Sequence, residues 1–519
     1  MALEAERALA DERALVDERA LADEGAVGTD ESGEGGLTLS LDLGSTNFKA
    51  ALFDAHLSRL AEASVALPYA VLDLPRAEFD EAAAWQAAVH AVHLVAEHAS
   101  IALQDVRTLA LTSQAQTFAL FDAIGAPLTP FVSWMDARAA NEASQLDAAF
   151  GPAFHAHCSF APPLAELQLA KILWLRTHDP AALERAARIM PLPTWVAARM
   201  AGVEILDRNL AAMSGLYSLQ AGGWWSEALA LCGIDAGRLP SLVAVGAQCV
   251  AAVPPNSPFT ASSGLVVVPA GNDQTTGALA NGCGAGTLVV TLGTAAVAYR
   301  WAGTQPGPYA PRGCWGPYPG GGYYELAAAT HGTVALDWAC KQLYPGADVT
   351  AFFAYAASAW PDVPQRTPPV LFFPDRIGTS AAWAGPADVA RRALAVLEGI
   401  AFQVRRLICV ELQAGTGMER VTVTGGGSRS DLWLQVLADV LACPVRRGHG
   451  DALLGAAMVA RPGVVPPGVA GMSERQRAWA MAQGPEGDRT ARGPGADLFV
   501  PDAARARTYE AVYREWERG

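Results

Sequence analysis

Two distant segments of the chain follow one plan, in which an apolar strand, a turn with glycine and a hydroxyl side chain, and a second strand come in order. The first segment is LTLSLDLGSTNFKAALFD, residues 37–54, and the second begins with the apolar run at 287–292. Aligning the two turns pairs Asp42, Leu43, Gly44 and Ser45 with Thr291, Leu292, Gly293 and Thr294. A repeated supersecondary unit constrains a chain to build related parts. The sequence therefore predicts an α/β protein with two similar halves.

The two turns have the composition of phosphate-binding turns. Glycine lets a strand turn sharply and lets backbone N–H groups approach phosphate oxygens. The neighbouring Ser45, Thr46 and Thr294 add hydroxyl donors. A single strand followed by Gly-Thr is common in ordinary hairpins, where the glycine has only a structural role. Two such turns in equivalent places, at Gly44 and Gly293, favour nucleotide phosphates as the ligand.

A lone acid, Asp273, lies between the two turns in the segment AGNDQTTGALANG. Transfer of a phosphoryl group to a hydroxyl needs an aligned acceptor and a nearby carboxylate that takes its proton. Asp273 is therefore the predicted catalytic base, although at the start of a predicted helix it could also be only an N-cap. Asp42, just ahead of the first turn, could hold Mg²⁺ directly or through water, because hard cations prefer carboxylate oxygen.

A third strand ends in glycines, in VTVTGGGSRSDLWLQ at residues 421–435. Without side chains at Gly425, Gly426 and Gly427, a flat base or a ribose could lie against the backbone. The helix expected to begin at Ser430 would direct its N-terminal dipole toward a nearby phosphate. This segment is the third predicted nucleotide-binding element.

Polar residues also follow two strands early in the chain. The run from Ser113 to Gln116 lies between predicted strands at 106–112 and 118–122, and FVSWMDAR covers residues 131–138. Binding sites of α/β proteins lie at strand ends and in the loops that follow them. These two segments are therefore candidate parts of a substrate site.

Composition narrows the classes of function. The chain has 519 residues, 51% hydrophobic and 17% charged, as expected for a soluble globular protein of two or three domains. The net charge of -15 argues against nucleic acid as a partner. No apolar stretch approaches the ~18 to 20 residues of a membrane helix. The eight cysteines include no CxxC pair, so reduced thiols and a cytoplasmic location are expected.

Residues 1–36 are acidic and repetitive, with ALEAER, ALADER, ALVDER and ALADEG preceding a glycine-rich run. They differ from a signal peptide, which begins with basic residues and carries an apolar stretch. One interpretation is an acidic docking tail. The favoured interpretation is a disordered, solvated low-complexity extension or a misplaced start codon.

From Leu37 onward, strand and helix patterns alternate. Strands are expected near 37–42, 48–54, 58–66, 106–112, 118–122, 265–269, 287–292 and 420–424. Helices are expected from about 80 to 96, near 163–177, 184–200, 224–231, 332–343 and 386–413, and from 430. His90, His93 and His98 are interpreted as solvated helix residues, and His155 with His157 as part of a loop, in neither case as metal ligands. The Gly-, Pro- and Arg-rich region from about 462 to 495 is expected to be a surface excursion.

Taken together, these segments resemble the FGGY carbohydrate kinases, whose fold belongs to the actin, sugar kinase and heat-shock ATPase superfamily. The resemblance covers about residues 37–460 and depends on five ordered motifs, DLGSTNFKA, GNDQTTGALANG, TLGTAAVAY, TGGGSRSDLWLQVLADVLACPV and DALLGAAMVA. It implies two ribonuclease H-like domains around an ATP and sugar cleft, with sugar mostly on residues 37–282 and ATP mostly on residues 283–519. It also implies ATP and Mg²⁺ as cofactors and a small-molecule sugar or polyol as partner, and it leaves a homodimer open.

The same resemblance assigns roles to individual residues. The catalytic base is Asp273, and the metal ligands are Asp42 and Asp273. ATP binding is assigned to Gly44, Ser45, Thr46, Gly293, Thr294, Gly426, Gly427 and Ser430. Sugar binding is assigned to Ala115, Gln116, Trp134, Asp136, Asp273 and Gln274.

The acceptor pair departs from the best-known members of that family. Glycerol kinases carry ArgGlu and xylulokinases MetHis where this chain has Ala115 and Gln116. Lys49 and Asn47 stand where the glycerol kinase motif has Arg and Ser. With WMDAR at 134–138, the resemblance is closer to xylulokinase-like enzymes, and a ketopentose such as xylulose is the expected substrate. Ribulose, gluconate, erythritol and glycerol remain alternatives.

Two interpretations from other classes also stay open. One is a catalytically silent sugar or nucleotide sensor, against which the intact Asp42 and Asp273 argue. The other is an actin-like or chaperone-like ATPase, which the sugar-site residues and GNDQTTG disfavour.

Overall fold

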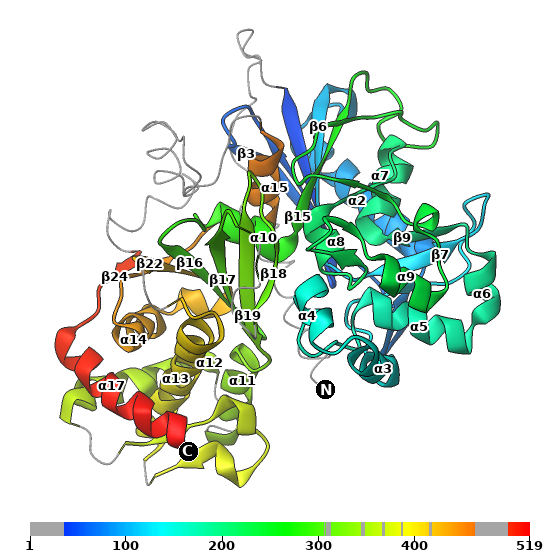
Figure 1. The fold of residues 1–519 in the computed structure, drawn as a ribbon. Coiled ribbons are helices and arrows are strands. Elements are labelled where there is room, and N and C mark those ends of the chain that lie inside the picture. The colour runs from blue at the N-terminus through cyan, green and yellow to red at the C-terminus, as the bar shows by residue number, and fades with distance from the viewer. Residues whose placement is uncertain are drawn as a thin grey trace. The chain divides into compact units, whose positions relative to one another are not determined.

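The computed structural model describes residues 36–305, 307, 313–343, 348–365, 369–385, 388–414, 418–461 and 497–519. The acidic repeat before Gly36 and the expected excursion at 462–495 lie outside these residues. Residues Leu37–Gly519 form one compact unit. Figure 1 follows this unit from the blue strands after residue 36 to the red C-terminal helix.

Six strands form the first sheet, in the order β14-β15-β6-β1-β2-β3. β1 pairs antiparallel with β2 and parallel with β6, β2 pairs antiparallel with β3, and β6 pairs parallel with β15. The central strands are buried along most of their length, as expected for apolar strands covered on both faces. The strands are β1 (Leu37–Leu43), β2 (Asn47–Phe53), β3 (Arg59–Ala66), β6 (Val106–Ser113), β14 (Cys249–Val250) and β15 (Val266–Asn272).

Seven strands form the second sheet, in the order β18-β19-β17-β16-β22-β23-β24. β16 pairs antiparallel with β17 and parallel with β22, β17 pairs antiparallel with β19, and β22 pairs parallel with β23. The strands are β16 (Thr287–Leu292), β17 (Ala296–Gly303), β18 (Cys314–Pro317), β19 (Tyr323–Ala329), β22 (Arg420–Thr424), β23 (Val445–Arg447) and β24 (Leu498–Phe499). Five consecutive strands of each sheet thus follow the same sequence of antiparallel and parallel pairings, which confirms the predicted α/β fold with two related halves.

Helices from different parts of the chain cover the first sheet. α2 (Glu81–His98) and α7 (Leu192–Ala201) share one apolar cluster with its strands. α15 (Ala452–Ala460) joins two further clusters with the sheet, one with β2 through Leu453 and Ala457, and one with β6 and β15 through Ala456 and Ala460. α15, which follows the strands of the second sheet up to β23 in the chain, therefore completes the apolar core of the first sheet.

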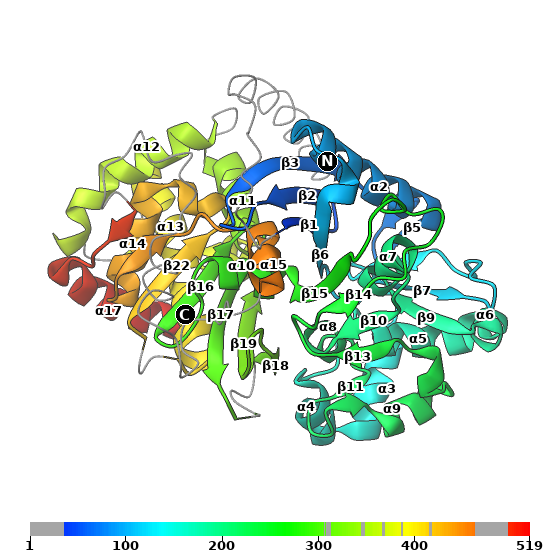
Figure 2. The ribbon, with the colours of Figure 1, turned by 90° about the horizontal axis from the view of Figure 1, so that it is seen from above.

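The second sheet packs against another set of helices, which gather around α13 in Figures 1 and 2. They are α11 (Thr333–Leu343), α12 (Val349–Ala359), α13 (Val389–Arg406), α14 (Asp431–Leu441) and α17 (Ala503–Arg518). α10 (Asp273–Ala280) joins a separate cluster with this sheet, in which Ala278 and Leu279 meet Val289 and Tyr299. α10 also packs along α15, so this helix pair contacts both sheets.

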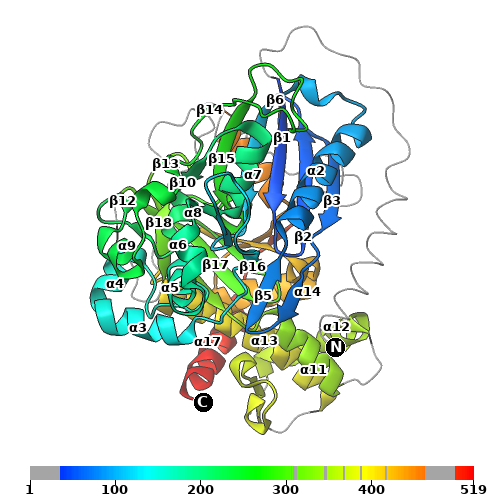
Figure 3. The same ribbon diagram turned by 90° about the vertical axis from the view of Figure 1, so that its right-hand side faces the viewer.

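A third sheet has five antiparallel strands in the order β4-β5-β8-β7-β9. These strands are β4 (Val71–Asp73), β5 (Arg76–Phe79), β7 (Phe118–Phe121), β8 (Phe131–Val132) and β9 (Arg188–Pro191). Its apolar partners include the helices grouped in Figure 3, namely α3 (Ala140–Phe150), α4 (Pro152–Cys158), α5 (Gln168–His178), α6 (Pro180–Arg185) and α9 (Ser226–Cys232). This sheet carries both segments of the predicted sugar site.

Short elements fill the connections. They are α8 (Arg208–Ala212) and three two-stranded pairs, β10 (Ile205–Asp207) with β13 (Ser241–Val243), β11 (Tyr217–Ser218) with β12 (Gly223–Trp224), and β20 (Leu371–Phe372) with β21 (Trp383–Ala384). Among the described residues, no helix combines the length and apolar character that a membrane crossing requires. All eight cysteines are free thiols.

Three predicted elements differ from the structure. The expected helix at 184–200 is divided, because β9 pairs with β7 before α7 begins at Leu192. The helix expected at 163–177 begins only at Gln168. The prediction of a loop around His155 and His157 was wrong, since both lie in α4, a helix that starts with proline at its first position.

Candidate active site

Three parallel strands of the first sheet end at one edge, and the predicted acids lie there. Asp42 on β1 pairs with Thr112 on β6, and Asn272 on β15 pairs with Ser113 on β6. Asp273 follows directly after β15. The two predicted metal ligands therefore come together at the carboxyl ends of neighbouring strands, where α/β sheets place their sites.

Asp42 has a carboxylate oxygen without a protein partner. Its Oδ1 is buried and accepts no hydrogen bond from any residue that the structure describes. Burial first, and the charge of Asp273 second, raise the pKa of Asp42 to about 8, against the opposing charge of Lys49. A nearby cation favours the charged form of a buried carboxylate, and Mg²⁺ prefers such hard oxygen ligands. The residues present therefore fit the predicted metal.

Asp273 is the first residue of α10, and Asn272 is the N-cap, with its side-chain Oδ1 accepting from the Thr275 N–H at 2.8 Å. The Asp273 carboxylate is therefore not needed to cap the helix. Its Oδ1 accepts from the Gln274 N–H at 2.8 Å. Burial raises the pKa of Asp273 to about 6, against backbone hydrogen bonds that stabilise the carboxylate. The group is thus ionised at neutral pH but more basic than an ordinary aspartate.

The start of α10 is held by Asn209 of α8, a residue that sequence reasoning missed. Asn209 Oδ1 accepts from the backbone N–H and the side-chain amide of Asn272, both at 2.9 Å. Its Nδ2 donates to Thr275 Oγ1 at 2.9 Å and to the Pro317 carbonyl at 2.8 Å. Gly271 has φ +94°, and a Cβ there would lie 3.1 Å from Asn209 Oδ1. Glycine thus allows the amide to approach the turn that carries the predicted base.

The first predicted phosphate turn is tight. A Cβ at Gly44 would lie 2.7 Å from the Asn47 carbonyl oxygen, so only glycine fits without opening the turn. Gln114, the residue after β6, donates from Nε2 to the Gly44 carbonyl at 3.0 Å. Ser45 is half-buried and Thr46 is exposed. The end of β6 therefore supports this turn, and the Thr46 side chain is open to solvent.

The second predicted phosphate turn is supported from α11. The Thr333 N–H donates to the Gly293 carbonyl at 2.7 Å, and the Gly332 N–H donates to the Thr294 carbonyl at 2.8 Å. Gly293 itself donates to the Ala295 carbonyl at 3.0 Å. A Cβ at Gly332 would overlap the Gly293 carbonyl oxygen. Gly332 is thus a second residue that the sequence interpretation missed.

The third predicted nucleotide element meets the second turn. β16 and β22 are parallel neighbours with Thr291 opposite Thr424, so both end at the same edge. Gly425 has φ +83°, and a Cβ there would lie 2.6 Å from the Leu292 carbonyl oxygen. The two elements predicted to bind ATP in the second sheet therefore adjoin.

The residues assigned to adenosine differ in their surroundings. A Cβ at Gly427 would lie 2.8 Å from the Leu292 Cβ and 2.9 Å from the Trp433 ring. Ser430 caps α14, because its Oγ accepts from the Trp433 N–H at 3.2 Å. At Gly426 a Cβ would have no atom of the described residues within 4 Å. Packing thus explains Gly427 and capping explains Ser430, and contact of these three residues with adenosine stays a prediction.

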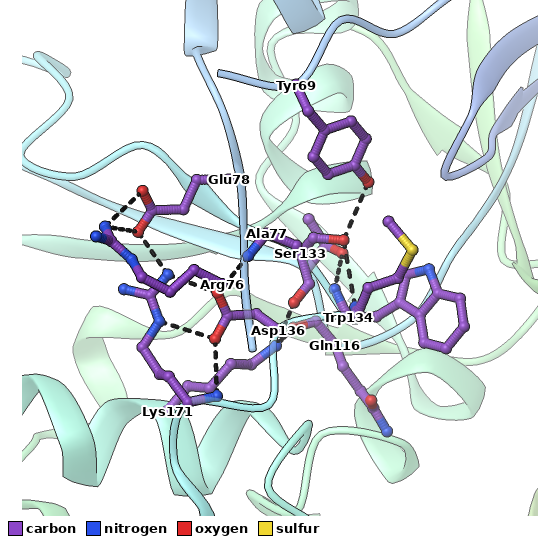
Figure 4. Close-up of polar contacts among 12 residues, drawn as sticks. Tyr69, Arg76, Ala77, Glu78, Gln116, Ser133, Trp134, Asp136 and Lys171 are labelled. Carbon is purple, nitrogen blue, oxygen red and sulfur yellow. Dashed lines mark hydrogen bonds and ion pairs between the residues drawn. The ribbon is translucent and has the colours of Figure 1, made fainter. Parts of the chain in front are cut away.

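The predicted sugar segments lie next to each other at one end of β7 and β8, with Gln116 just before β7 and Trp134 just after β8 (Figure 4). Gln116 has φ +64° and donates from Nε2 to the Met213 carbonyl at 3.0 Å. Trp134 is 41% exposed, and its backbone N–H donates to Thr117 Oγ1 at 2.9 Å. Thr117 Oγ1 in turn donates to Gln114 Oε1 at 3.0 Å. Gln114 thus connects the sugar segments to the first phosphate turn.

Asp136 is engaged by protein groups in this structure. It is fully buried, and its Oδ2 accepts from the Ala77 N–H at 2.8 Å. Arg138 donates from Nε to Asp136 Oδ1 at 2.8 Å and also forms an ion pair with Glu78. This geometry supports the loop that carries Trp134, and direct contact of Asp136 with a sugar stays a prediction.

Two further predicted pocket residues are half-buried. Ala115 packs against a cluster that includes Leu206, Tyr217 and Trp315. Gln274 lies in the first turn of α10, beside Asp273. Both positions are compatible with a small ligand at the ends of β6 and β15.

The missed residues left different traces in the sequence. Lys171, whose Nζ donates to the Gln116 and Ser133 carbonyls, is a single charge in the apolar run QLAKILWL, a pattern that indicates a buried cation with a special partner. Gln114 belongs to the polar run SQAQ, of which only the later residues had been assigned. Gly332 and Asn209 contact segments far away in the chain, so no local pattern marks them.

A duplicated sheet with glycine turns and paired acids defines a nucleotide-dependent phosphotransferase. The model of the FGGY family of carbohydrate kinases, N-terminal domain, matches residues 37–280, and that of the C-terminal domain matches residues 288–461. The chain therefore belongs to the FGGY family of carbohydrate kinases, and the predicted resemblance is confirmed. It is an ATP-dependent carbohydrate kinase that acts on a small-molecule sugar.

Individual relatives carry different substrate names. The chain is 27% identical to a glycerol kinase of Alkalilimnicola ehrlichii, over 79% of this chain and 86% of that protein. It is 25% identical to a xylulose kinase of Escherichia coli, over 82% of this chain and 89% of that protein. The solved structure of a xylulose kinase from Rhodospirillum rubrum aligns with a TM-score of 0.79 and 23% identity, over 93% of this chain and 98% of that one. This last likeness supports the fold.

Proposed function

We propose that the chain transfers a phosphoryl group from ATP to a hydroxyl of a ketopentose such as xylulose, with Asp273 as the catalytic base. The observation that supports this proposal most is the shared edge of β1, β6 and β15. Asp42 ends the first of these strands, Ala115 and Gln116 follow the second, and Asp273 follows the third. The residues proposed to bind the sugar, the proposed base and the proposed metal ligands thus lie at the ends of adjacent strands.

Asp273 has the properties that a base for hydroxyl attack needs. Its raised pKa of about 6, caused by burial, leaves it ionised at neutral pH and able to accept the proton of the attacking hydroxyl. The N–H of Gln274 holds Oδ1. Asn209 and the Asn272 cap fix the first turn of α10, so the carboxylate is oriented before a substrate binds.

Asp42 and Asp273 are the proposed metal ligands. Bound Mg²⁺ would neutralise phosphate charge during transfer. Asp42 offers its unpartnered Oδ1, and Asp273 lies at the same strand edge. The donor set of two carboxylates is the type that Mg²⁺ takes together with waters and phosphate oxygens.

ATP would bind across the glycine turns. We assign its phosphates to Gly44, Ser45, Thr46, Gly293 and Thr294, and its adenosine to Gly426, Gly427 and Ser430. Tight glycine turns expose backbone N–H groups, which suits anionic oxygens. The corresponding division is a sugar domain at residues 37–282 and an ATP domain at residues 283–519, with α15 packing back onto the first sheet.

The pocket residues favour a neutral, polyhydroxylated acceptor. Ala115, Gln116, Trp134 and Gln274 carry no charge. The two cations beside them, Lys171 and Arg138, are already bonded to protein oxygens. A carboxylate substrate such as gluconate would therefore have no unengaged cation among these six residues, and a ketose would find amide and indole donors instead.

An assay of ADP release over xylulose, ribulose, erythritol, gluconate and glycerol tests the proposal. We expect the highest kcat/KM with a ketopentose and poor turnover of glycerol. Binding of sugar without turnover would support the sensor, and ATP turnover that ignores sugar would support the ATPase. Either result, or a clear preference for gluconate or glycerol, would overturn the proposed substrate.

A further inference from the structure

A buried lysine joins the two segments of the proposed sugar pocket. Lys171 of α5 is 1% exposed and lies in a turn of helix whose neighbours Leu169, Ala170 and Ile172 are fully buried. Its Nζ donates to the Ser133 carbonyl at 2.8 Å and to the Gln116 carbonyl at 3.0 Å. Figure 4 shows the ammonium between these two backbone segments.

Burial of the charged Lys171 ammonium is energetically unfavourable, so the contacts that hold it there require an explanation. Burial lowers the pKa of Lys171 to about 7, against the charges of Asp136 and Glu166, while the charge of Arg138 acts in the same direction as burial. The ring of Phe118 lies 5.9 Å from Nζ. Removing the amine would leave the buried Ser133 carbonyl and the partly buried Gln116 carbonyl without this donor, and unpaired buried acceptors are unfavourable.

The two carbonyls belong to peptides that orient the pocket side chains. Gln116 adopts the left-handed backbone region, which side chains other than glycine rarely occupy, and Lys171 binds its carbonyl in that conformation. Ser133 directly precedes Trp134, whose N–H is held by Thr117. One ammonium thus links the strained peptide of Gln116 to the peptide that presents the exposed indole.

Other hydrogen bonds hold Ser133 through its side chain and its backbone N–H. Ser133 Oγ lies 3.1 Å from the Tyr69 hydroxyl and accepts from the Met135 N–H at 3.3 Å. The Ser133 N–H donates to the Ala77 carbonyl at 3.0 Å. Without Lys171, these bonds would still hold Ser133 and the Trp134 N–H would still donate to Thr117, but the Gln116 carbonyl would lose its bond to the ammonium. The lysine therefore matters for the spacing between the segments more than for either segment alone.

We propose that Lys171 is a positioning residue for sugar recognition, whose ammonium holds the Gln116 and Ser133 peptides at the spacing that lets Gln116 and Trp134 bind one sugar. This inference depends on the proposed function, because it takes both side chains as pocket residues. Lys171 acts through them and does not itself touch the sugar.

The test compares Lys171→Met with Leu175→Ala, a control in a buried residue of the same helix. Methionine keeps the length and apolar stem of lysine but cannot donate. We expect Lys171→Met to raise KM for the sugar at least about tenfold, as expected when a hydrogen-bonding site loses its alignment, with KM for ATP nearly unchanged. Leu175→Ala should lower the melting temperature without changing either KM.

A chemical rescue separates positioning from general packing. In Lys171→Ala, propylammonium can enter the space of the missing side chain and donate to the two carbonyls, whereas propanol can offer only one neutral donor. We expect propylammonium to lower KM for the sugar and propanol to have little effect. If Lys171→Met does not fold, Lys171→Ala without added amine, which also lacks the donor, takes its place in the comparison.

The outcomes distinguish this inference from the proposed function. Wild-type protein without sugar-stimulated ADP release would contradict the proposed function and the inference with it. Normal wild-type turnover, with both KM values unchanged in the lysine variants, would overturn the inference alone. Parallel changes in KM for sugar and ATP, insensitive to propylammonium, would also overturn it and make Lys171 a residue of the general core.

Discussion

The two sheets share a topology but differ at the second-last residue of the first strand of each repeat. Asp42 on β1 lies opposite Thr112, and Thr291 on β16 lies opposite Thr424. Thr424 Oγ1 donates to Thr291 Oγ1 at 3.3 Å, whereas Asp42 Oδ1 has no partner among the described residues. The repeated scaffold thus supplies two equivalent strand ends, and one of them carries a carboxyl group with an unpartnered oxygen. Shared topology places a site, and single residues decide its chemistry.

The supports of the two glycine turns differ as well. The first turn is held by the side chain of Gln114, which also reaches the sugar segments through Thr117. The second is held by backbone N–H groups of Gly332 and Thr333 at the start of α11. The first support connects the proposed phosphate turn to the proposed sugar segments, and the second contacts only the turn proposed to bind ATP. Changes in the two should therefore affect different kinetic constants.

The largest expected effect comes from the proposed catalytic base. Asp273→Asn keeps the shape of the side chain but cannot accept a proton, so we expect kcat to fall by ~10² to 10⁴. ATP binding and the melting temperature should change little, since Asn272 and Asn209 hold the start of α10. Steady-state kinetics and a thermal melt measure both. A variant with more than about a tenth of the wild-type kcat would remove Asp273 as the base.

Asp42→Thr converts the first strand end into a copy of the second. Loss of a carboxylate ligand should raise the Mg²⁺ concentration for half-maximal activity by at least about tenfold. A Mg²⁺ titration of kcat measures the effect, and Thr291→Val, which removes the hydroxyl pair in the second sheet, is the matched control. An equal Mg²⁺ requirement in wild type and Asp42→Thr would show that the two strand ends do not differ in metal binding.

Gln116→Ala tests the proposed sugar segment, which Gln114 and Thr117 connect to the first glycine turn. Loss of an amide that donates and accepts should lower kcat/KM for the best sugar by about tenfold or more and leave KM for ATP largely unchanged. Glycerol should be a poor substrate of the wild type, because the charged ArgGlu pair of glycerol kinases is absent at Ala115 and Gln116. Equal changes in the constants for ATP and sugar, or efficient glycerol turnover, would exclude Gln116 from the pocket.

Gly332→Ala tests the support of the second turn. The added Cβ would overlap the Gly293 carbonyl, which should cost about 1 to 3 kcal/mol of stability and raise KM for ATP several-fold. Gly223→Ala is the control, because a Cβ there meets no described atom within 4 Å. The prediction fails if the two variants have the same melting temperature and the same KM for ATP.

The smallest effect is expected from deletion of residues 1–36. The hexad repeat offers no sustained apolar face, so the body should keep its melting temperature and its kcat/KM within about twofold. Kinetics of a chain that starts at Leu37 provide the test. Loss of most activity or of folding would show that the body begins before Leu37.

Local patterns were sufficient for much of this architecture. β1, β16 and β22 follow from apolar strands that end in glycine turns, and α2 follows from its helical spacing of apolar residues. Periodicity failed at β9, because a short buried strand before α7 has the same apolar character as a helix turn. Strand pairing with β7, a contact distant in sequence, decides between them.

The residues of the candidate site also divide into those that stand in a local sequence motif and those that act through distant contacts. The prediction of Asp42, Asp273 and the glycine turns as site residues depends on local motifs, in which each of them stands. The partners that hold them, Asn209 for the Asn272 cap and Lys171 for Gln116, act across 63 and 55 residues of sequence. Asn209 has no local signature, and the isolated charge of Lys171 indicates a buried cation but does not identify its partner, so the contacts of both follow only from the three-dimensional structure.

The return of α15 to the first sheet limits how this chain can be cut. Ala110, Val268 and Ala51 of that sheet are covered by side chains that appear only after residue 451. A nascent chain that has just left the ribosome at residue 282 would still expose this apolar face to water and to other unfolded chains. The core of the first sheet is thus completed only after α15 has been synthesised. For the same reason, residues 37–282 and 283–519 cannot be exchanged between enzymes as independent domains.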